Sequence, residues 1–93
     1  MMDEVARKQV VRRLQSIEGH IRGIQRMVDE EAYCIETMKQ ISAVQAALAK
    51  VNQMILENHL NTCVTSAVRG DNAQERERVL REIADVFEMT TKV

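Results

Sequence analysis

Two cysteines and a histidine are the residues of this sequence best suited to bind a metal ion. His59 and Cys63 are four residues apart, so on a helix their side chains project from one face about a turn apart. The only other cysteine, Cys34, lies 25 residues before His59. Thiolate and imidazole groups are good ligands for transition metals. Helical cysteines are also often just small apolar residues, so these residue types alone leave open a metal site and two structural thiols.

The separation of Cys34 from the other two residues determines how a site can form. On one continuous helix, a rise of about 1.5 Å per residue places Cys34 roughly 37 Å from His59. Metal–ligand bonds are only about 2.0–2.3 Å long, so one chain cannot close the site. Two antiparallel copies that cross near residues 47–48, within the small-residue stretch 46–49, would bring Cys34 of each to His59 and Cys63 of the other. The spacing therefore predicts a homodimer with two intersubunit sites.

The predicted ligand set narrows the choice of metal. Two thiolates and one imidazole form a soft, three-coordinate set, which suits Cu(I). Zinc would require a fourth ligand or a coordinated water molecule. His20 is the only other histidine and lies among arginines, so we expect it to be a surface residue rather than a ligand.

The composition indicates an all-α fold that would position these residues. The chain has no proline or tryptophan, one tyrosine, one phenylalanine and three glycines, and it is rich in good helix formers. Apolar residues three and four apart predict a first helix at about 4–29, and a broad apolar stripe predicts a second at about 33–69. After Gly70, a capping-box pattern at Asn72 and Glu75 predicts a third helix at about 72–89. All 93 residues would form a single domain, 1–93.

Two features of the predicted helices bear on how they pack. Gly19 and Gly23 lie inside the first helix, where each costs about 1 kcal/mol relative to alanine. The close approach of another helix would compensate for that cost. The second helix, at about 55 Å, is too long to bury its apolar stripe against a first helix of about 25 residues. It therefore needs a partner chain.

The charges are unevenly distributed along the chain. Residues 1–28 contain six basic and three acidic residues, a net charge of +3, whereas the whole chain carries −1. Such a segment can face an anionic partner, or it can be a solvated helix surface. The sequence has no signal peptide and no run of about 18 apolar residues. We therefore expect a cytoplasmic protein that does not enter the membrane and whose cysteines stay reduced.

Three stretches of the sequence resemble the CsoR/RcnR family of copper-sensing operon repressors: RLQSIEGHIRGIQRMV at residues 13–28, Tyr33-Cys34, and HLNTCV at residues 59–64. The resemblance covers nearly the whole chain. It implies three-helix protomers that pair as antiparallel hairpins and assemble into a dimer of dimers, a homotetramer. It also implies a repressor that binds operator DNA without metal and releases it on binding Cu(I), which derepresses copper-resistance and efflux genes.

Within that family, Cys34, His59 and Cys63 match the ligands of the Cu(I) sensors. The nickel and cobalt sensors have histidine in place of the last cysteine and a further ligand near the N-terminus, where this chain reads Met-Met-Asp-Glu. The formaldehyde sensors use an N-terminal proline, which this chain lacks, and the persulfide sensors generally lack the histidine. A persulfide-responsive repressor that uses Cys34 and Cys63 is the competing function within the family.

Two functions outside transcriptional repression also bear on these residues. A cytoplasmic copper storage or chaperone bundle could share the two thiolates and the imidazole, but it would not need a basic first helix. An enzyme with a small-molecule substrate is not indicated, because the sequence has no Ser/His/Asp pairing and no glycine-rich phosphate loop.

The resemblance also implies roles for residues around the ligands. Tyr33 would neighbour the first ligand, and a glutamate of the third helix would complete a hydrogen-bond network, for which the candidates are Glu75, Glu77 and Glu82. His20 stands where the family commonly has glutamine. DNA phosphates would be neutralised by basic residues of the first two helices. These are Lys8, Arg12, Arg13, Arg22, Arg26 and Lys50.

Overall fold

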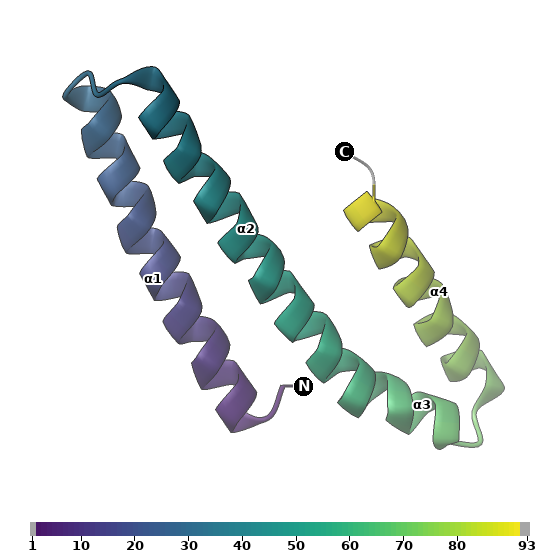
Figure 1. Ribbon diagram of the computed structural model, residues 1–93. Coiled ribbons are helices and arrows are strands. Elements are labelled where there is room, and N and C mark those ends of the chain that lie inside the picture. The colour runs from purple at the N-terminus through teal and green to yellow at the C-terminus, as the bar shows by residue number, and fades with distance from the viewer. Residues whose placement is uncertain (1, 92–93) are drawn as a thin grey trace. The chain divides into compact units, whose positions relative to one another are not determined.

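A computed structural model describes residues 2–91, and within this range the chain forms helices joined by short turns (Figure 1). The elements are α1 (Glu4–Asp29), α2 (Cys34–His59), a π-helical turn η1 (Leu60–Val64), α3 (Thr65–Arg69) and α4 (Ala73–Thr91). The predicted all-α class is confirmed. None of the helices within residues 2–91 is long and apolar enough to cross a membrane. The contacts divide the chain into two compact units, residues 2–57 and the residues from Asn58 onward.

The first unit is an antiparallel hairpin in which α1 lies beside α2 (Figure 1). Its core is a buried cluster of four aliphatic residues, in which Val10 and Ile17 of α1 meet Val44 and Val51 of α2. The two members from each helix are seven residues apart, so they lie on one face two turns apart. A seven-residue apolar spacing on both helices is therefore what aligns the hairpin.

The acidic stretch after α1 forms the connection to α2. Glu31 has a positive φ of 58°. The N–H of Ala32 donates to the carbonyl of Met27 at 2.9 Å, and the N–H of Glu31 donates to that of Val28 at 3.1 Å. This pair of hydrogen bonds is a Schellman motif, which ends a helix by satisfying its last carbonyls. The motif usually has glycine where this chain has Glu31.

The hairpin leaves much of its apolar surface exposed. Eight large aliphatic side chains of the two helices are between 38% and 62% exposed: Val11, Leu14, Ile21, Val28, Ile35, Ile41, Leu48 and Ile55. Near the connection, a surface hollow of about 480 Å³ is lined mainly by apolar residues, among them Ile21, Ile24, Ile41 and Val44. The first unit therefore buries only part of the stripes that the sequence pattern defines.

The two glycines of α1 have no neighbouring helix against them within residues 2–91. A Cβ atom added at Gly19 would meet nothing within 4 Å, and one added at Gly23 would meet only the side chain of Arg26, at 3.8 Å. The expectation that a nearby helix compensates for these glycines is therefore wrong for α2. Their cost to α1 is not offset by packing in the described part of the chain.

The predicted helix 33–69 is interrupted. The π-helical turn η1 follows α2, and the N–H of Thr65 donates to the carbonyl of Leu60, five residues earlier. Threonine hydroxyls reinforce this turn: Thr65 Oγ1 donates to the same Leu60 carbonyl at 2.7 Å, and Thr62 Oγ1 donates to the carbonyl of Asn58 at 2.8 Å. Such side-chain bonds compete with the regular backbone ladder, which gives the local break a physical reason.

The helix α4 begins at a polar cap. The side chain of Asn72 accepts the N–H of Glu75 at 3.0 Å, as the capping pattern predicts. The carboxylate of Glu75 forms an ion pair with Arg78, which is a contact outside the capping box. The apolar spacing of this helix predicts a buried side made of Val79, Leu80, Ile83, Val86 and Phe87. Val79 is buried and Ile83 and Val86 are half-buried, whereas Leu80 and Phe87 remain 50% and 68% exposed.

Candidate metal centre

The three predicted metal ligands lie at the two ends of α2 and in the turn that follows it. Cys34 is the first residue of α2, His59 is its last, and Cys63 lies in η1. Both cysteines are free thiols, Cys34 exposed and Cys63 half-buried. Across residues 2–91, no three histidine, cysteine, aspartate or glutamate side chains gather in a group that could hold a metal ion. The pairing of Cys34 with a second copy of the chain stays a prediction.

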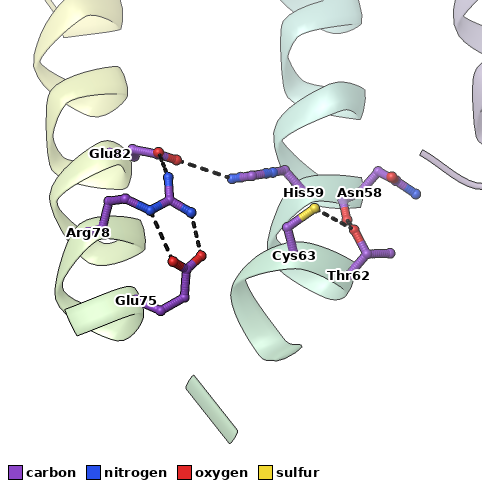
Figure 2. Close-up of polar contacts among 7 residues, drawn as sticks. All are labelled: Asn58, His59, Thr62, Cys63, Glu75, Arg78 and Glu82. Atoms are coloured by element: carbon purple, nitrogen blue, oxygen red, sulfur yellow. Dashed lines mark hydrogen bonds and ion pairs between the residues drawn. The ribbon is translucent and has the colours of Figure 1, made fainter. Parts of the chain in front are cut away.

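The π-helical turn determines the setting of His59 and Cys63. His59 directly precedes η1, so the three residues between the two ligands lie in π-helical backbone rather than in a regular α-helix. The hydroxyl of Thr62 lies 3.6 Å from Cys63 Sγ, and it also donates to the carbonyl of Asn58 (Figure 2). Because the Thr62 hydroxyl has one proton, which it donates to the Asn58 carbonyl, it can donate to Cys63 Sγ only in exchange for that bond.

Among the three candidate glutamates, Glu82 is the one whose carboxylate faces a predicted ligand. Its Oε2 lies 4.0 Å from Nε2 of His59, and Figure 2 shows the imidazole pointing toward it from the other helix. Glu75 pairs with Arg78 instead, and Glu77 is exposed on the same helix. The Tyr33 side chain is 71% exposed and directly precedes α2, so its predicted place in a hydrogen-bond network stays a prediction.

Arg78 is a residue of this region for which the sequence pattern predicted no role near the ligands. Its guanidinium donates to both carboxylate oxygens of Glu75 and to Oε1 of Glu82 (Figure 2). The hydrogen bond from Arg78 holds the pKa of Glu75 below its ordinary value, and the same bond raises the pKa of Arg78. The spacings of three and four residues are those of helix-surface ion pairs, and that signal could have identified Arg78.

The predicted DNA-binding residues all lie in the first unit, and all are exposed. Lys8 forms an ion pair with Glu4 at 3.2 Å, and Arg22 lies 4.0 Å from Glu18. Arg12 and Arg13 line a surface hollow of about 440 Å³ together with Gln9, Ser16 and Met54. The ion pairs on α1 are surface contacts between exposed groups, which contribute little to stability and are easily exchanged for contacts to phosphates.

His20 differs from the sequence expectation. It is partly buried rather than a surface residue, and its Nε2 lies 2.7 Å from Oε1 of Gln40. This hydrogen bond joins α1 to α2 beside the core of the hairpin. The structure therefore gives His20 a structural contact, and Gln40 on the facing helix explains why a polar side chain is accommodated there.

Comparisons with known proteins agree on the family of this chain. The sequence profile of the family described as metal-sensitive transcriptional repressor matches residues 6–89. The copper-sensing transcriptional repressor CsoR of Bacillus subtilis (strain 168) is 43% identical over 84 residues, which cover 90% of this chain and 80% of that protein.

Solved structures give the same result. The copper-sensing repressor CsoR with Cu(I) from Geobacillus thermodenitrificans NG80-2 is 40% identical with a TM-score of 0.88, and the match covers 99% of this chain and 93% of that chain. The nickel-responsive transcriptional regulator InrS is 41% identical with a TM-score of 0.74, covering 86% of this chain and 90% of that chain. These similarities confirm the resemblance inferred from the sequence. The chain belongs to the family of metal-sensitive transcriptional repressors.

Proposed function

We propose that this protein is a Cu(I)-responsive transcriptional repressor, which binds operator DNA in the metal-free state and leaves it when Cu(I) binds. The observation that carries this proposal is the set of available ligands. Two free thiols and the imidazole of His59 are the soft donors that Cu(I) prefers, and Glu82 faces the imidazole. The similarity to repressors named as copper-sensing supports the same choice.

Cys34 of one protomer, with His59 and Cys63 of another, would hold the ion. Nε2 of His59 faces Glu82, which leaves Nδ1 for the metal and lets Nε2–H donate to the carboxylate. The thiols must lose their protons to bind the metal, and the Thr62 hydroxyl lies 3.6 Å from Cys63 Sγ. Bridging two protomers in this way would join the start of one α2 to the end of another.

Nickel is the competing metal, because a nickel-responsive regulator is among the similar structures. The residues of this chain favour copper. Cys63 would be a sulfur ligand where the family's nickel and cobalt sensors have histidine. A sulfur-rich set with three donors suits a monovalent soft ion better than a divalent ion that seeks more ligands.

The DNA-binding surface would lie on the exposed basic residues of α1 and on Lys50 of α2. Arg12 and Arg13 line one surface hollow, and Arg22 and Arg26 line another of about 450 Å³. Contacts of arginine and lysine to phosphates give an affinity that falls steeply with salt. The incompletely buried apolar faces of α1 and α2 would be covered in a dimer that assembles further into a tetramer.

Metal and DNA would act on each other through thermodynamic linkage. If Cu(I) binds better to a conformation with weak DNA affinity, DNA must weaken Cu(I) binding by the same factor. Typical coupling energies of about 1–3 kcal/mol correspond to roughly 5- to 150-fold changes in affinity. A change of that size is what a titration of operator affinity with Cu(I) should detect.

The test is an anaerobic DNA-binding titration with and without one equivalent of Cu(I) per chain. The probe is a DNA fragment selected from a random pool by its affinity for the metal-free protein. We expect Cu(I) to weaken binding within the range given above, and His59→Ala to abolish that response. His20→Ala is the matched control, because it removes the other histidine and should retain the response. Unchanged DNA affinity after stoichiometric Cu(I) loading would refute the proposal.

The same titration separates the competing functions. Release of DNA by an organic persulfide, with no response to Cu(I), would identify a persulfide sensor that uses Cys34 and Cys63. Tight Cu(I) binding by a chain that selects no DNA fragment would identify a copper storage or chaperone protein. Each outcome differs from the one that a copper-responsive repressor gives.

A further inference from the structure

A line of four polar side chains connects the first turn of α4 to the predicted ligand His59. Arg78 lies between Glu75 and Glu82 on α4, and Glu82 lies between Arg78 and His59 (Figure 2). All four belong to the same compact unit, which begins at Asn58. Along this line the charges of Glu75, Arg78 and Glu82 alternate, and His59 follows them as a group that can donate a hydrogen bond.

Glu82 uses its two oxygens for different partners. Oε1 accepts from Nη1 of Arg78, whereas Oε2 is the atom that lies 4.0 Å from Nε2 of His59. That distance exceeds the roughly 2.7–3.2 Å of an N–H···O hydrogen bond, so a small movement of either side chain is needed to form one. Arg78 therefore holds the carboxylate by one oxygen and leaves the other directed at the imidazole.

The position of Arg78 is itself fixed. Its Nε donates to Oε2 of Glu75 at 3.2 Å, and its Nη2 donates to the other oxygen of the same carboxylate. The N–H of Glu75 is in turn bound by the Asn72 side chain at the start of the helix. A two-pronged contact of this kind restricts the guanidinium more than a single ion pair does. The start of α4 thus fixes the orientation of Glu82.

We propose that Arg78 is a positioning residue for Glu82, which it keeps oriented toward His59 and thereby strengthens Cu(I) binding. This inference rests on the proposed function and deepens it, because it adds a residue that touches neither the metal nor its ligands. Removing Arg78 leaves Glu82 free to rotate away into solvent, since the Glu82 side chain is 45% exposed.

The opposing effect of Arg78 is smaller. Its positive charge reduces the attraction of Glu82 for a donor on His59. The Arg78 side chain is 57% exposed, so solvent screens most of this effect. Loss of a group that supports a ligand typically lowers metal affinity about 10- to 100-fold. Because it acts only through Glu82, loss of Arg78 should lower Cu(I) affinity by less, about 3- to 10-fold.

The test measures Cu(I) affinity of the full chain by anaerobic competition with a chromogenic Cu(I) chelator. Arg78→Met should weaken binding by about 3- to 10-fold, and Arg78→Lys should restore part of the loss because it can still hold one oxygen of Glu82. Arg81→Met is the matched control, since it removes an exposed arginine from the same helix, and should leave affinity unchanged. In a Glu82→Gln background, Arg78→Met should have no further effect.

A measurement without metal keeps this inference separate from the proposed function. At fixed pH, the ring resonances of His59 in NMR spectra of the metal-free chain should shift in Arg78→Met and stay in place in Arg81→Met. Unshifted His59 resonances, an equal loss of affinity with and without Glu82, or tighter Cu(I) binding by Arg78→Met would each overturn the role of Arg78. Failure of wild-type Cu(I) to release DNA would refute only the proposed function.

Discussion

Replacing Gly19 with alanine should stabilise the protein, because α1 carries the full cost of a glycine at a position where a methyl group has space. Gly19 lies well inside α1, and its added Cβ would meet nothing within 4 Å in the described structure. Alanine is favoured over glycine inside a helix by about 0.8–1.0 kcal/mol. With no steric term to subtract, the free energy of unfolding should rise by about 1 kcal/mol, which corresponds to roughly 4–8 °C in Tm.

Thermal and urea unfolding followed by circular dichroism at one fixed protein concentration would measure this gain, with the molar mass in solution determined in parallel. Gly70→Ala is a suitable control. A Cβ there would lie 3.3 Å from the carbonyl oxygen of Ser66, so no gain is expected. A loss of stability or of molar mass in Gly19→Ala would refute the reasoning. It would show that a second chain packs directly against this glycine.

Three further predictions concern caps and charges. Glu31→Gly should raise the free energy of unfolding by about 1 kcal/mol in urea titrations, because Glu31 has φ 58° and glycine adopts that conformation without strain; a lower midpoint would contradict this. Asn72→Ala should lower it by about 1 kcal/mol in the same assay, since the N–H of Glu75 loses its cap, and an unchanged midpoint would count against that role. The pKa of Glu75 is lowered by the hydrogen bond from Arg78, so that pair stabilises the fold above about pH 4.5 and loses its contribution as the pH falls through the lowered value. The difference in Tm between wild type and Arg78→Met should therefore shrink in acid, and a difference that stays constant down to about pH 2 would argue against it.

The hairpin was largely predictable because its signals are local and repeated. The apolar spacing that includes Val10, Ile17, Val44 and Val51 specifies which faces meet, and all four form the observed core. The acidic run at residues 29–31 also favours a helix boundary, because acids disfavour a helix C-terminus, and the Schellman motif at Glu31 completes this end of α1. Helix periodicity and helix ends are the features that a single sequence encodes most directly.

The surroundings of His59 were predictable only in part. The family resemblance implied three candidate glutamates, but only the packing of α4 against η1 distinguishes Glu82 from Glu75 and Glu77. Arg78 escaped notice because a surface arginine between two glutamates is common, and its importance comes from the orientation of one carboxylate. The sequence pattern did not predict the π-helical turn, because apolar periodicity does not reflect hydrogen bonds made by hydroxyl groups. The Thr65 hydroxyl, for example, donates to a carbonyl five residues earlier.

The π-helical turn also has a consequence for the insertion or deletion of residues in this part of the chain. A turn that closes five residues back holds one more residue than the α-helix on either side, so it behaves as a one-residue insertion. Because the turn already absorbs that extra residue, deleting exposed Asn61 would let regular helix continue with the later residues near their present orientation about the helix axis. Such a deletion would shorten the spacing of His59 and Cys63 from four residues to three while leaving Val44 and Val51 in place. The ligand spacing and the hairpin core can therefore vary independently.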